Sequence, residues 1–165
     1  MLTVRNMVET DLDAIAKLEA ATFTDAWTAK SIYDTFCQKQ AFIVTAENEG
    51  KVAGYCIVYF VLDEGEIARI AVDTSCRRQG VGCKILNQVN QICVKKGITR
   101  LMLDVRESNE NARKFYLSYG FQEDGIRKNF YDMPKEHAVL MSKNIAQLLA
   151  SKAAVPTRNR MTECL

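Results

Sequence analysis

The hydrophobic pattern of the chain changes abruptly around RRQGVGCK, residues 77–84. Before this segment, EIARIAVD (66–73) is apolar at nearly every position, which is typical of a strand in the middle of a sheet. After it, apolar residues recur at helical spacing from Val81 to Cys93, and Gly97 follows as a C-terminal cap. A central strand, a short glycine turn and an amphipathic helix together predict an α/β fold.

The same patterns predict the other elements. Strands are expected at 2–7, at 41–48 and 52–63 as a hairpin, and at 66–73, 100–107, 121–132 and 137–145. Helices are expected at 9–23, 28–39, from Gly80 to Gly97, and at 108–120. This order indicates one mixed sheet with helices on its faces. Residues 1–145 are expected to form a single domain, and 146–165 a short helix followed by a loose tail.

Composition excludes several classes of function. With 22 basic and 20 acidic residues the net charge is +2, so the basic face of a nucleic-acid binder is not expected. No apolar run is long enough to span a membrane, and the N-terminus does not resemble a secretory leader. The six cysteines form no C-x-x-C pair and there is one histidine, so no metal site is expected. These features predict a cytoplasmic protein with reduced thiols.

The glycine turn has several features that favour the binding of an anion. The first turn of a helix carries amides without intrahelical partners, and its dipole is positive at that end. Gly80 and Gly82 remove side chains that would obstruct the backbone, and Arg77, Arg78 and Lys84 add charge. The spacing fits neither a P-loop nor the G-x-G-x-x-G pattern of dinucleotide-binding folds. Taken alone, the segment is about as consistent with a structural turn as with a phosphate site.

Two further motifs extend this pattern. RRQGVG matches R/Q-x-x-G-x-G/A, LDVRESNENARKFYLSYGF (103–121) joins a strand to an aromatic-rich helix that ends in Y-x-x-Y-G-F, and NFYD precedes the last strand. With these motifs the chain resembles the GNAT family of acetyl-CoA-dependent N-acetyltransferases over residues 2–145. Within the family it is most similar to the ribosomal-protein alanine N-acetyltransferases of the RimI type. The resemblance implies a mixed, mostly antiparallel sheet of about seven strands, splayed at the cofactor slot, with about four helices.

The resemblance also implies where acetyl-CoA binds. The pyrophosphate would lie on the amides of the glycine turn, and the pantetheine arm would pair with the preceding strand. Val72 would offer its N–H to the thioester carbonyl, and Asn109 would contact the cofactor while also capping a helix. Cys83 is expected to supply an amide and not a reactive thiol. The implied cofactor-binding residues are Ile70, Ala71, Val72, Arg77, Arg78, Gln79, Gly80, Val81, Gly82, Cys83 and Asn109.

Two residues match catalytic positions of the family. Tyr116 stands where the family has its general acid, although its place on an apolar helix stripe would by itself indicate a core residue. Asp104 in LDVR stands where a glutamate is usual and is the expected base, with a reach shorter by about 1.5 Å. Glu66, or a water held by Asp104, is the alternative base. Pairing of Asp104 with Arg106, on the same strand face, is the purely structural alternative.

Two aromatic residues are implied on the acceptor side. Tyr131 in NFYD matches a family tyrosine near the substrate, although a structural strand aromatic fits nearly as well. Trp27 lies in FTDAWT, where related chains tend to carry F-P-W-[ST], and the missing proline leaves the acceptor specificity open. The helices expected within 10–39 would frame this side of the groove.

The favoured function is acetylation of a protein N-terminal α-amine, with ribosomal-protein alanine as the preferred acceptor and acetyl-CoA as cosubstrate. An α-amine has a pKa of about 7.7–8.0, against about 10.4 for lysine, so more of it is neutral near pH 7 and it demands less of a base. An acetyltransferase for amino acids or polyamines is the second interpretation, which an acidic acceptor pocket would favour. A non-catalytic CoA-binding module is the third; the short Asp104 suggests it, whereas Tyr116 argues against it.

Overall fold

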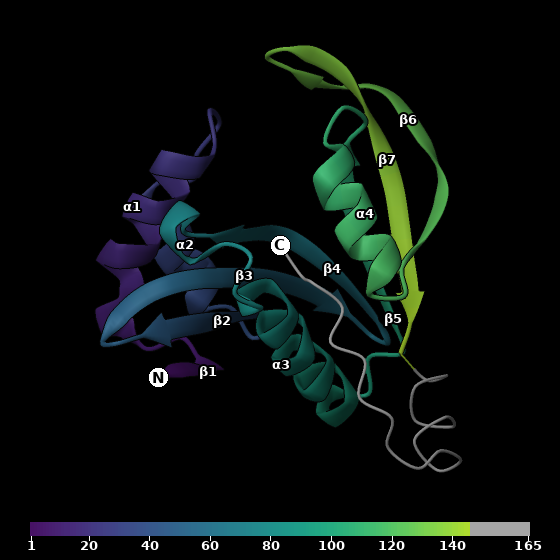
Figure 1. The fold of residues 1–165 in the computed structure, drawn as a ribbon. Coiled ribbons are helices and arrows are strands. Elements are labelled where there is room, and N and C mark those ends of the chain that lie inside the picture. Colours follow the sequence, from purple (N-terminus) through teal and green to yellow (C-terminus); the bar gives the residue numbers. More distant parts are fainter. Residues whose placement is uncertain (146–165) are drawn as a thin grey trace.

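The computed structural model describes residues 1–145, so the short helix and tail expected at 146–165 lie outside the described residues (Figure 1). The strands are β1 (Leu2–Asn6), β2 (Ala41–Asn48), β3 (Lys51–Val61), β4 (Glu64–Val72), β5 (Arg100–Arg106), β6 (Gln122–Asp132) and β7 (Lys135–Asn144). The helices are α1 (Leu12–Thr22), α2 (Ala29–Phe36), α3 (Val81–Lys96) and α4 (Glu110–Ser118), with short 3₁₀ turns at Glu9–Asp11 and Thr74–Cys76. The expected order of elements is confirmed.

The strands within residues 1–145 form one sheet of seven, in the order β1-β2-β3-β4-β5-β7-β6. Every neighbouring pair is antiparallel except β4 and β5, which are parallel. The mixed, mostly antiparallel sheet is therefore confirmed, with β4 in its centre. No helix within residues 1–145 is both long enough and apolar enough to cross a membrane.

Each face of the sheet has its own apolar core. On one face α3 and α4 pack onto the strands through Val81, Ile85, Leu86, Val89, Phe115 and Tyr116. On the other face α1 and α2 pack through Ile15, Leu18 and Ile32, against Ile43, Tyr55 and Ile57. The helices thus form two layers with the sheet between them, and the two layers flank different sides of any opening in the sheet.

Local signals explain several helix ends. Thr28 caps α2 by accepting a hydrogen bond from the Ser31 amide at 3.1 Å. Asn109 caps α4 in the same way, accepting from the Ala112 amide at 3.2 Å. Gly97 ends α3 with a φ of +74°, a left-handed conformation that glycine adopts without steric cost. The caps expected at Asn109 and Gly97 are confirmed.

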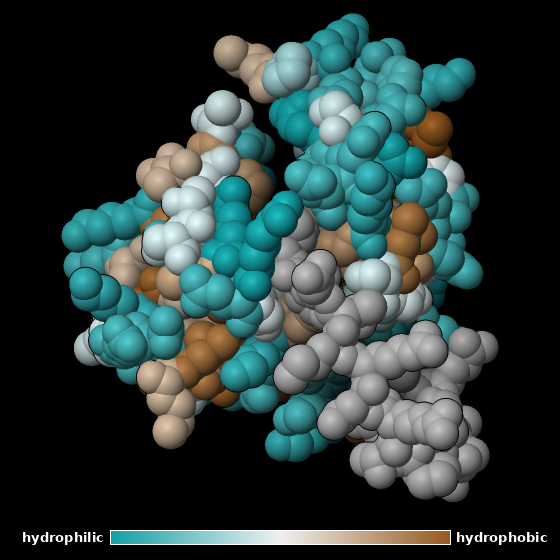
Figure 2. Space-filling model, viewed as in Figure 1, coloured by the Kyte–Doolittle hydropathy of each residue, from teal (hydrophilic) through white to brown (hydrophobic). Residues whose placement is uncertain are grey.

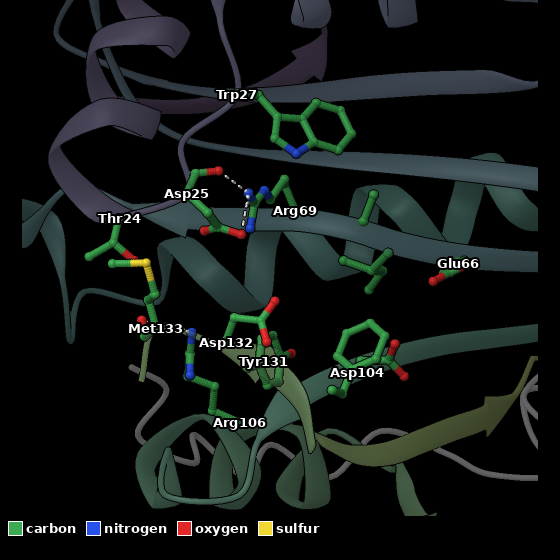
Figure 3. Close-up of a pocket in the computed structure, with 13 residues that line it drawn as sticks. Thr24, Asp25, Trp27, Glu66, Arg69, Asp104, Arg106, Tyr131, Asp132 and Met133 are labelled. Atoms are coloured by element: carbon green, nitrogen blue, oxygen red, sulfur yellow. Dashed lines mark hydrogen bonds and ion pairs between the residues drawn. The ribbon is translucent and has the colours of Figure 1, made fainter. Parts of the chain in front are cut away.

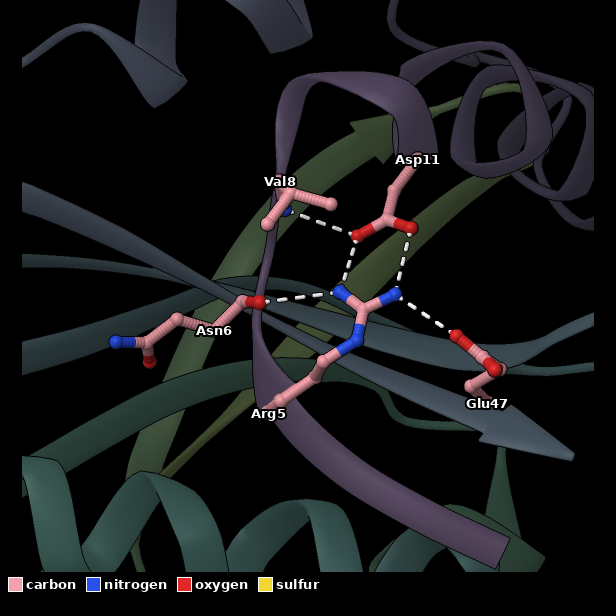
Figure 4. Close-up of polar contacts among 5 residues, drawn as sticks. All are labelled: Arg5, Asn6, Val8, Asp11 and Glu47. Atoms are coloured by element: carbon pink, nitrogen blue, oxygen red, sulfur yellow. Dashed lines mark hydrogen bonds and ion pairs between the residues drawn. The ribbon is translucent and has the colours of Figure 1, made fainter. Parts of the chain in front are cut away.

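An arginine on β1 fixes the start of α1 (Figure 4). Arg5 donates to both carboxylate oxygens of Asp11, at 2.6 and 2.9 Å, and to Glu47 on β2 at 2.9 Å. The Val8 amide also donates to Asp11, at 3.0 Å. Burial acts to raise the pKa of Asp11, but these hydrogen bonds hold it below its usual value. Strand β1, the turn before α1 and β2 are thereby held together.

The sheet divides between its two parallel strands. β4 and β5 pair only over Glu64–Ile67 and Arg100–Leu103, which is four pairs. Beyond that point β4 stays with β3 as far as Val72, and β5 stays with β7 as far as Arg106. The strands therefore diverge, and the opening expected between two neighbouring strands is confirmed. In space-filling view a notch separates the α1–α2 part of the surface from the β6–β7 part (Figure 2).

Candidate active site

A cavity of about 570 Å³ lies at the opening of the sheet (Figure 3). It is lined by Thr24, Asp25 and Trp27 of the α1–α2 loop, by 66–69 of β4, by Asp104 and Arg106 of β5, and by 130–133 of the β6–β7 hairpin. Four residues singled out in the sequence therefore meet here: Trp27, Glu66, Asp104 and Tyr131. The loop and the hairpin form its two walls.

A bulge in β4 shapes the floor of this cavity. Arg69 pairs with Ile57 and Ile67 pairs with Val58, so Ala68 has no partner on β3. Such an extra residue lets two consecutive side chains face the same side of a sheet. Ala68 packs with the α1–α2 core, and Arg69 reaches Glu19 on α1. The bulge thus turns Arg69 toward the cavity.

Glu19 is a carboxylate buried beneath the α1–α2 loop, with 0% of its surface exposed. It accepts a hydrogen bond from the Trp27 amide at 3.0 Å and another from the Tyr55 hydroxyl. Its Oε1 also lies 3.1 Å from Nε of Arg69, whose N–H is not aligned for a hydrogen bond, so this contact is electrostatic. Burial raises the pKa of Glu19, and the Trp27 amide and Arg69 oppose that rise.

Arg69 connects this buried carboxylate to the loop. Its Nη2 donates to the carbonyl oxygen of Asp25 at 2.7 Å and lies 3.3 Å from the Asp25 carboxylate. Its guanidinium lies over the rings of Phe23, at 4.6 Å, and Trp27, at 5.6 Å. Figure 3 shows Asp25 and Arg69 in contact beside Trp27. Sequence reasoning missed Glu19 and Arg69, although Glu19 falls on the apolar face of its helix, a usable signal.

Asp104 does not pair with Arg106, and that alternative is wrong. The Asp104 carboxylate lies 3.6 Å from Nη1 of Arg127 on β6, with 19% of its side chain exposed. Arg106 instead lies 3.4 Å from the carboxylate of Glu136 and stacks on the Tyr131 ring at 4.2 Å. Strand alternation puts both residues on one face, but β7 offers Arg106 another carboxylate and β6 offers Asp104 another cation.

The alternative base lies across the opening from Asp104. Glu66 is exposed and is in register with Met102, two residues before Asp104. Paired residues in a parallel ladder share a face, so Glu66 and Asp104 point to the same side of the sheet. Both carboxylates line the cavity, one on each of the diverging strands.

Tyr116 lies on the other side of the opening and does not line the cavity. It is 7% exposed and belongs to the core beneath α3 and α4, with Phe115 and Phe121 rings at 5.4 and 5.5 Å. Burial raises the pKa of its hydroxyl, and Cys56 and Tyr131 add to the rise. The hydroxyl is protonated at neutral pH, as a proton donor must be.

The glycine turn leaves the backbone open at Gly80, as the sequence predicts, and is closely packed at Gly82. Gly80 has a φ of +76° with open space around the position of a Cβ, and no side chain within residues 1–145 caps α3 behind it. The first hydrogen bond of the helix runs from the Lys84 amide to the Gly80 carbonyl, so the amide of Val81 has no acceptor within the helix. Gly82 has a packing role that the sequence did not predict, because a Cβ there would lie 3.2 Å from the Phe115 ring. Its missing side chain therefore permits close packing of α3 on α4.

The other residues expected to hold a cofactor lie around this turn. Arg77 is exposed and donates from Nε to the Val72 carbonyl at 3.2 Å. Arg78 is exposed, with a φ of +59°, and Gln79 donates to the Ser75 carbonyl at 3.0 Å. The backbones of Ile70, Ala71 and Val72 lie on β4 beyond its last pair with β5. The glycine turn follows them, and Cys83 lies in the first turn of α3. Asn109 is exposed at the start of α4.

These features fit one extended ligand on the α3 side. A strand edge left by the departure of β5 can pair with an amide-bearing chain, and an uncapped helix start can take a pyrophosphate. An amine can reach the same opening from the cavity on the α1–α2 side, which is lined by the carboxylates of Asp25, Glu66, Asp104 and Asp132. The arrangement suits transfer of a group between ligands that meet within the sheet.

Comparisons with known proteins agree with this arrangement. The model of a family described as the acetyltransferase (GNAT) family matches residues 12–121. A Bacillus subtilis protein, provisionally named as a ribosomal protein bS18-alanine N-acetyltransferase, is 37% identical over 84% of this chain and 92% of its own length. The ribosomal protein bS18-alanine N-acetyltransferase of Escherichia coli is 33% identical over 88% and 99%. A crystal structure of the Escherichia coli ribosomal-protein-S18-alanine N-acetyltransferase has a TM-score of 0.81 at 30% identity, covering 98% of this chain and all of that one.

Proposed function

Because this chain belongs to the GNAT family of acetyl-CoA-dependent N-acetyltransferases, we propose that its acceptor is the N-terminal α-amine of a protein, with ribosomal-protein alanine preferred. The observation that carries this proposal is the cavity between the α1–α2 loop and the β6–β7 hairpin, at the opening of the sheet. A peptide terminus can enter between two such walls. The names of the bS18-alanine N-acetyltransferase relatives support the same class of acceptor.

The residues on the α3 side would hold acetyl-CoA. Amides at the start of α3 and the exposed guanidinium groups of Arg77 and Arg78 would take the pyrophosphate. The edge of β4 beyond Ile67 would pair with the pantetheine arm, and the Val72 amide would face the thioester carbonyl. When bound, acetyl-CoA supplies an activated acetyl carbon and a thiolate leaving group.

Asp104 would receive the proton of the incoming ammonium group. Its carboxylate faces the cavity and is held by Arg127, and an intervening water would make up for its short side chain. The neutral amine would then attack the acetyl carbon, while the Val72 N–H stabilises the charge that develops on the carbonyl oxygen. As the C–S bond breaks, Tyr116 would donate its proton to the departing thiolate, and it would regain a proton, through water, from the positively charged nitrogen of the new amide. Trp27 and Tyr131, on opposite walls, would orient the acceptor.

Thiol release in the presence of acetyl-CoA tests the proposal. The acceptors are an Ala-initiated peptide, the same peptide with a blocked N-terminus, free alanine and spermidine, and mass spectrometry locates the added acetyl group. We expect release with the free peptide only, and acetylation of its α-amine. Release with the small amines but not with the peptide would replace the proposed acceptor. If no acceptor causes thiol release although acetyl-CoA binds, the result would support a non-catalytic CoA-binding module.

A further inference from the structure

Strands β6 and β7 lose their register at two places, and the larger of the two irregularities lies between Arg127 and Tyr131, beside the cavity. On β6 three residues, 128–130, lie between Arg127 and Tyr131, whereas on β7 only His137 lies between the residues that pair with those two. Within this segment Asn129 has a left-handed backbone, with a φ of +53°. A bulge of this size cannot make the regular hydrogen bonds of a ladder. Its shape therefore depends on other contacts.

The side chain opposite the bulge supplies such a contact. The Asn129 N–H donates a hydrogen bond to Nδ1 of His137 at 2.9 Å. Nδ1 must be unprotonated to accept it, so the proton of the neutral ring is on Nε2. The carbonyl of His137 also accepts from the Glu107 amide, at 3.1 Å, just beyond the end of β5. His137 thus ties the bulge to the strand that carries Asp104.

The residues at the end of the bulge form one wall of the cavity. Phe130 and Tyr131 both line it, and their rings meet edge to face with centroids 5.0 Å apart. Arg127 lies 4.9 Å over Phe130, and Arg106 lies 4.2 Å over Tyr131. The two rings are thus stacked against neighbours on both sides, and their place in the cavity follows the backbone of the bulge.

We propose that His137 is a positioning residue for the acceptor, because its ring fixes the bulge that presents Phe130 and Tyr131 to the cavity. The proposal rests on the proposed function to the extent that this cavity receives the acceptor. The chemistry of transfer does not involve His137, whose Nδ1 is occupied by a backbone amide. Arg127 lies before the bulge, and its pairing with Ala138 on β7 holds the backbone from which it contacts Asp104. Loss of the ring therefore acts on acceptor binding and not on the chemical step.

Three variants test this role. His137→Leu removes the acceptor atom, His137→Asn keeps an acceptor near the position of Nδ1, and Lys128→Ala changes an exposed side chain of the same bulge. For His137→Leu we expect the KM for an Ala-initiated peptide to rise about fivefold, the effect of one lost hydrogen bond of ordinary strength. The kcat and the KM for acetyl-CoA should stay within about twofold of the unmodified protein. His137→Asn and Lys128→Ala should resemble the unmodified protein.

Amide hydrogen exchange at Asn129 gives a second readout that does not need turnover. Exchange should be faster in His137→Leu than in the unmodified protein and in His137→Asn. If no peptide is acetylated by the unmodified protein, the proposed function fails, and the exchange data still decide whether His137 holds the bulge. Three results for His137→Leu would refute the role of His137: an unchanged KM for the peptide, a fall in kcat beyond about twofold, or unchanged exchange of the Asn129 amide. It is equally refuted if His137→Asn behaves like His137→Leu.

Discussion

Nε of Arg69 lies 3.1 Å from a carboxylate oxygen of Glu19, with 14% and 0% of the two side chains exposed. The pair joins the central strand β4 to helix α1. Because the Trp27 amide donates to the same carboxylate, the pair also fixes the loop wall of the cavity. The cavity therefore depends on a buried ion pair beneath it.

Removing only the cation of this pair should be costly. Arg69→Met would leave Glu19 buried without its counter-charge, and the free energy of unfolding should fall by about 3–5 kcal/mol. In the double variant with Glu19→Gln, no charge is stranded and part of the loss should be recovered. Urea unfolding of both single variants and the double variant measures this coupling. Purely additive losses would show that the two residues act independently.

Tyr116→Phe should separate catalysis from packing. The ring remains in the core of α3 and α4, so stability and acetyl-CoA affinity should change little. Loss of the proton donor should lower kcat by about two orders of magnitude. Thiol release gives kcat, and calorimetric titration gives the affinity for acetyl-CoA. A variant with unchanged turnover would remove Tyr116 from the mechanism.

Asp104→Asn should produce a defect that depends on pH. Near pH 7 much of an α-amine is protonated, because its pKa is about 7.7–8.0, and a base is useful there. Turnover should fall about tenfold or more at pH 7, and the deficit should shrink near pH 9, where the amine is already neutral. Glu66→Gln, on the facing strand, is the matched control. A larger defect in that control would transfer the role of base to Glu66.

Gly82→Ala should destabilise the protein by crowding two helices. The new Cβ would lie 3.2 Å from the Phe115 ring, and overpacking of this kind costs about 1–3 kcal/mol. Gly80→Ala is the matched control, since its Cβ meets open space and only the left-handed backbone is strained, at about 1–2 kcal/mol. Thermal unfolding compares the two. If Phe115→Leu relieves the loss in Gly82→Ala but not in Gly80→Ala, the contact is confirmed.

Lys143 should make stability depend on pH. Its ammonium donates to the Tyr119 carbonyl at 2.6 Å, and burial lowers its pKa to about 8. Between about pH 8 and pH 10 the unfolded chain keeps this proton while the folded chain releases it, so the free energy of unfolding should rise with pH, by about 1–2 kcal/mol. Lys143→Met should lack that rise. Urea unfolding at several pH values compares the two proteins, and parallel curves would contradict the assignment.

Local signals predicted much of the fold. The change of period at Gly80, the glycine after α3 and the asparagine before α4 each act through neighbouring residues, and all three agree with the structure. Family resemblance, and not local pattern, implied the opening beside β4, which the strand pairing confirms. Periodicity placed Asp104 and Arg106 on one face correctly, but it could not identify their partners, which other strands supply.

The features that sequence reasoning missed depend on distant contacts. Arg69 turns toward Glu19 because of a bulge whose register is set by β3. The sequence predicts that Gly82 keeps the backbone clear, but it could not show that the ring of Phe115, from another helix, packs against this position. The roles of Tyr116 and of the glycine turn in transfer stay predictions, and Tyr116→Phe tests the first of them.

The division of the sheet between β4 and β5 also affects the order in which ligands can bind to the enzyme and leave it. The start of α3 and the acceptor cavity belong to opposite sides of the sheet, so the two ligands of the proposed reaction would have separate entrances. Neither would then have to pass the other on the way in or out. An acetylated peptide could depart while spent CoA is still in place, and the next acceptor would wait only for exchange on the far side.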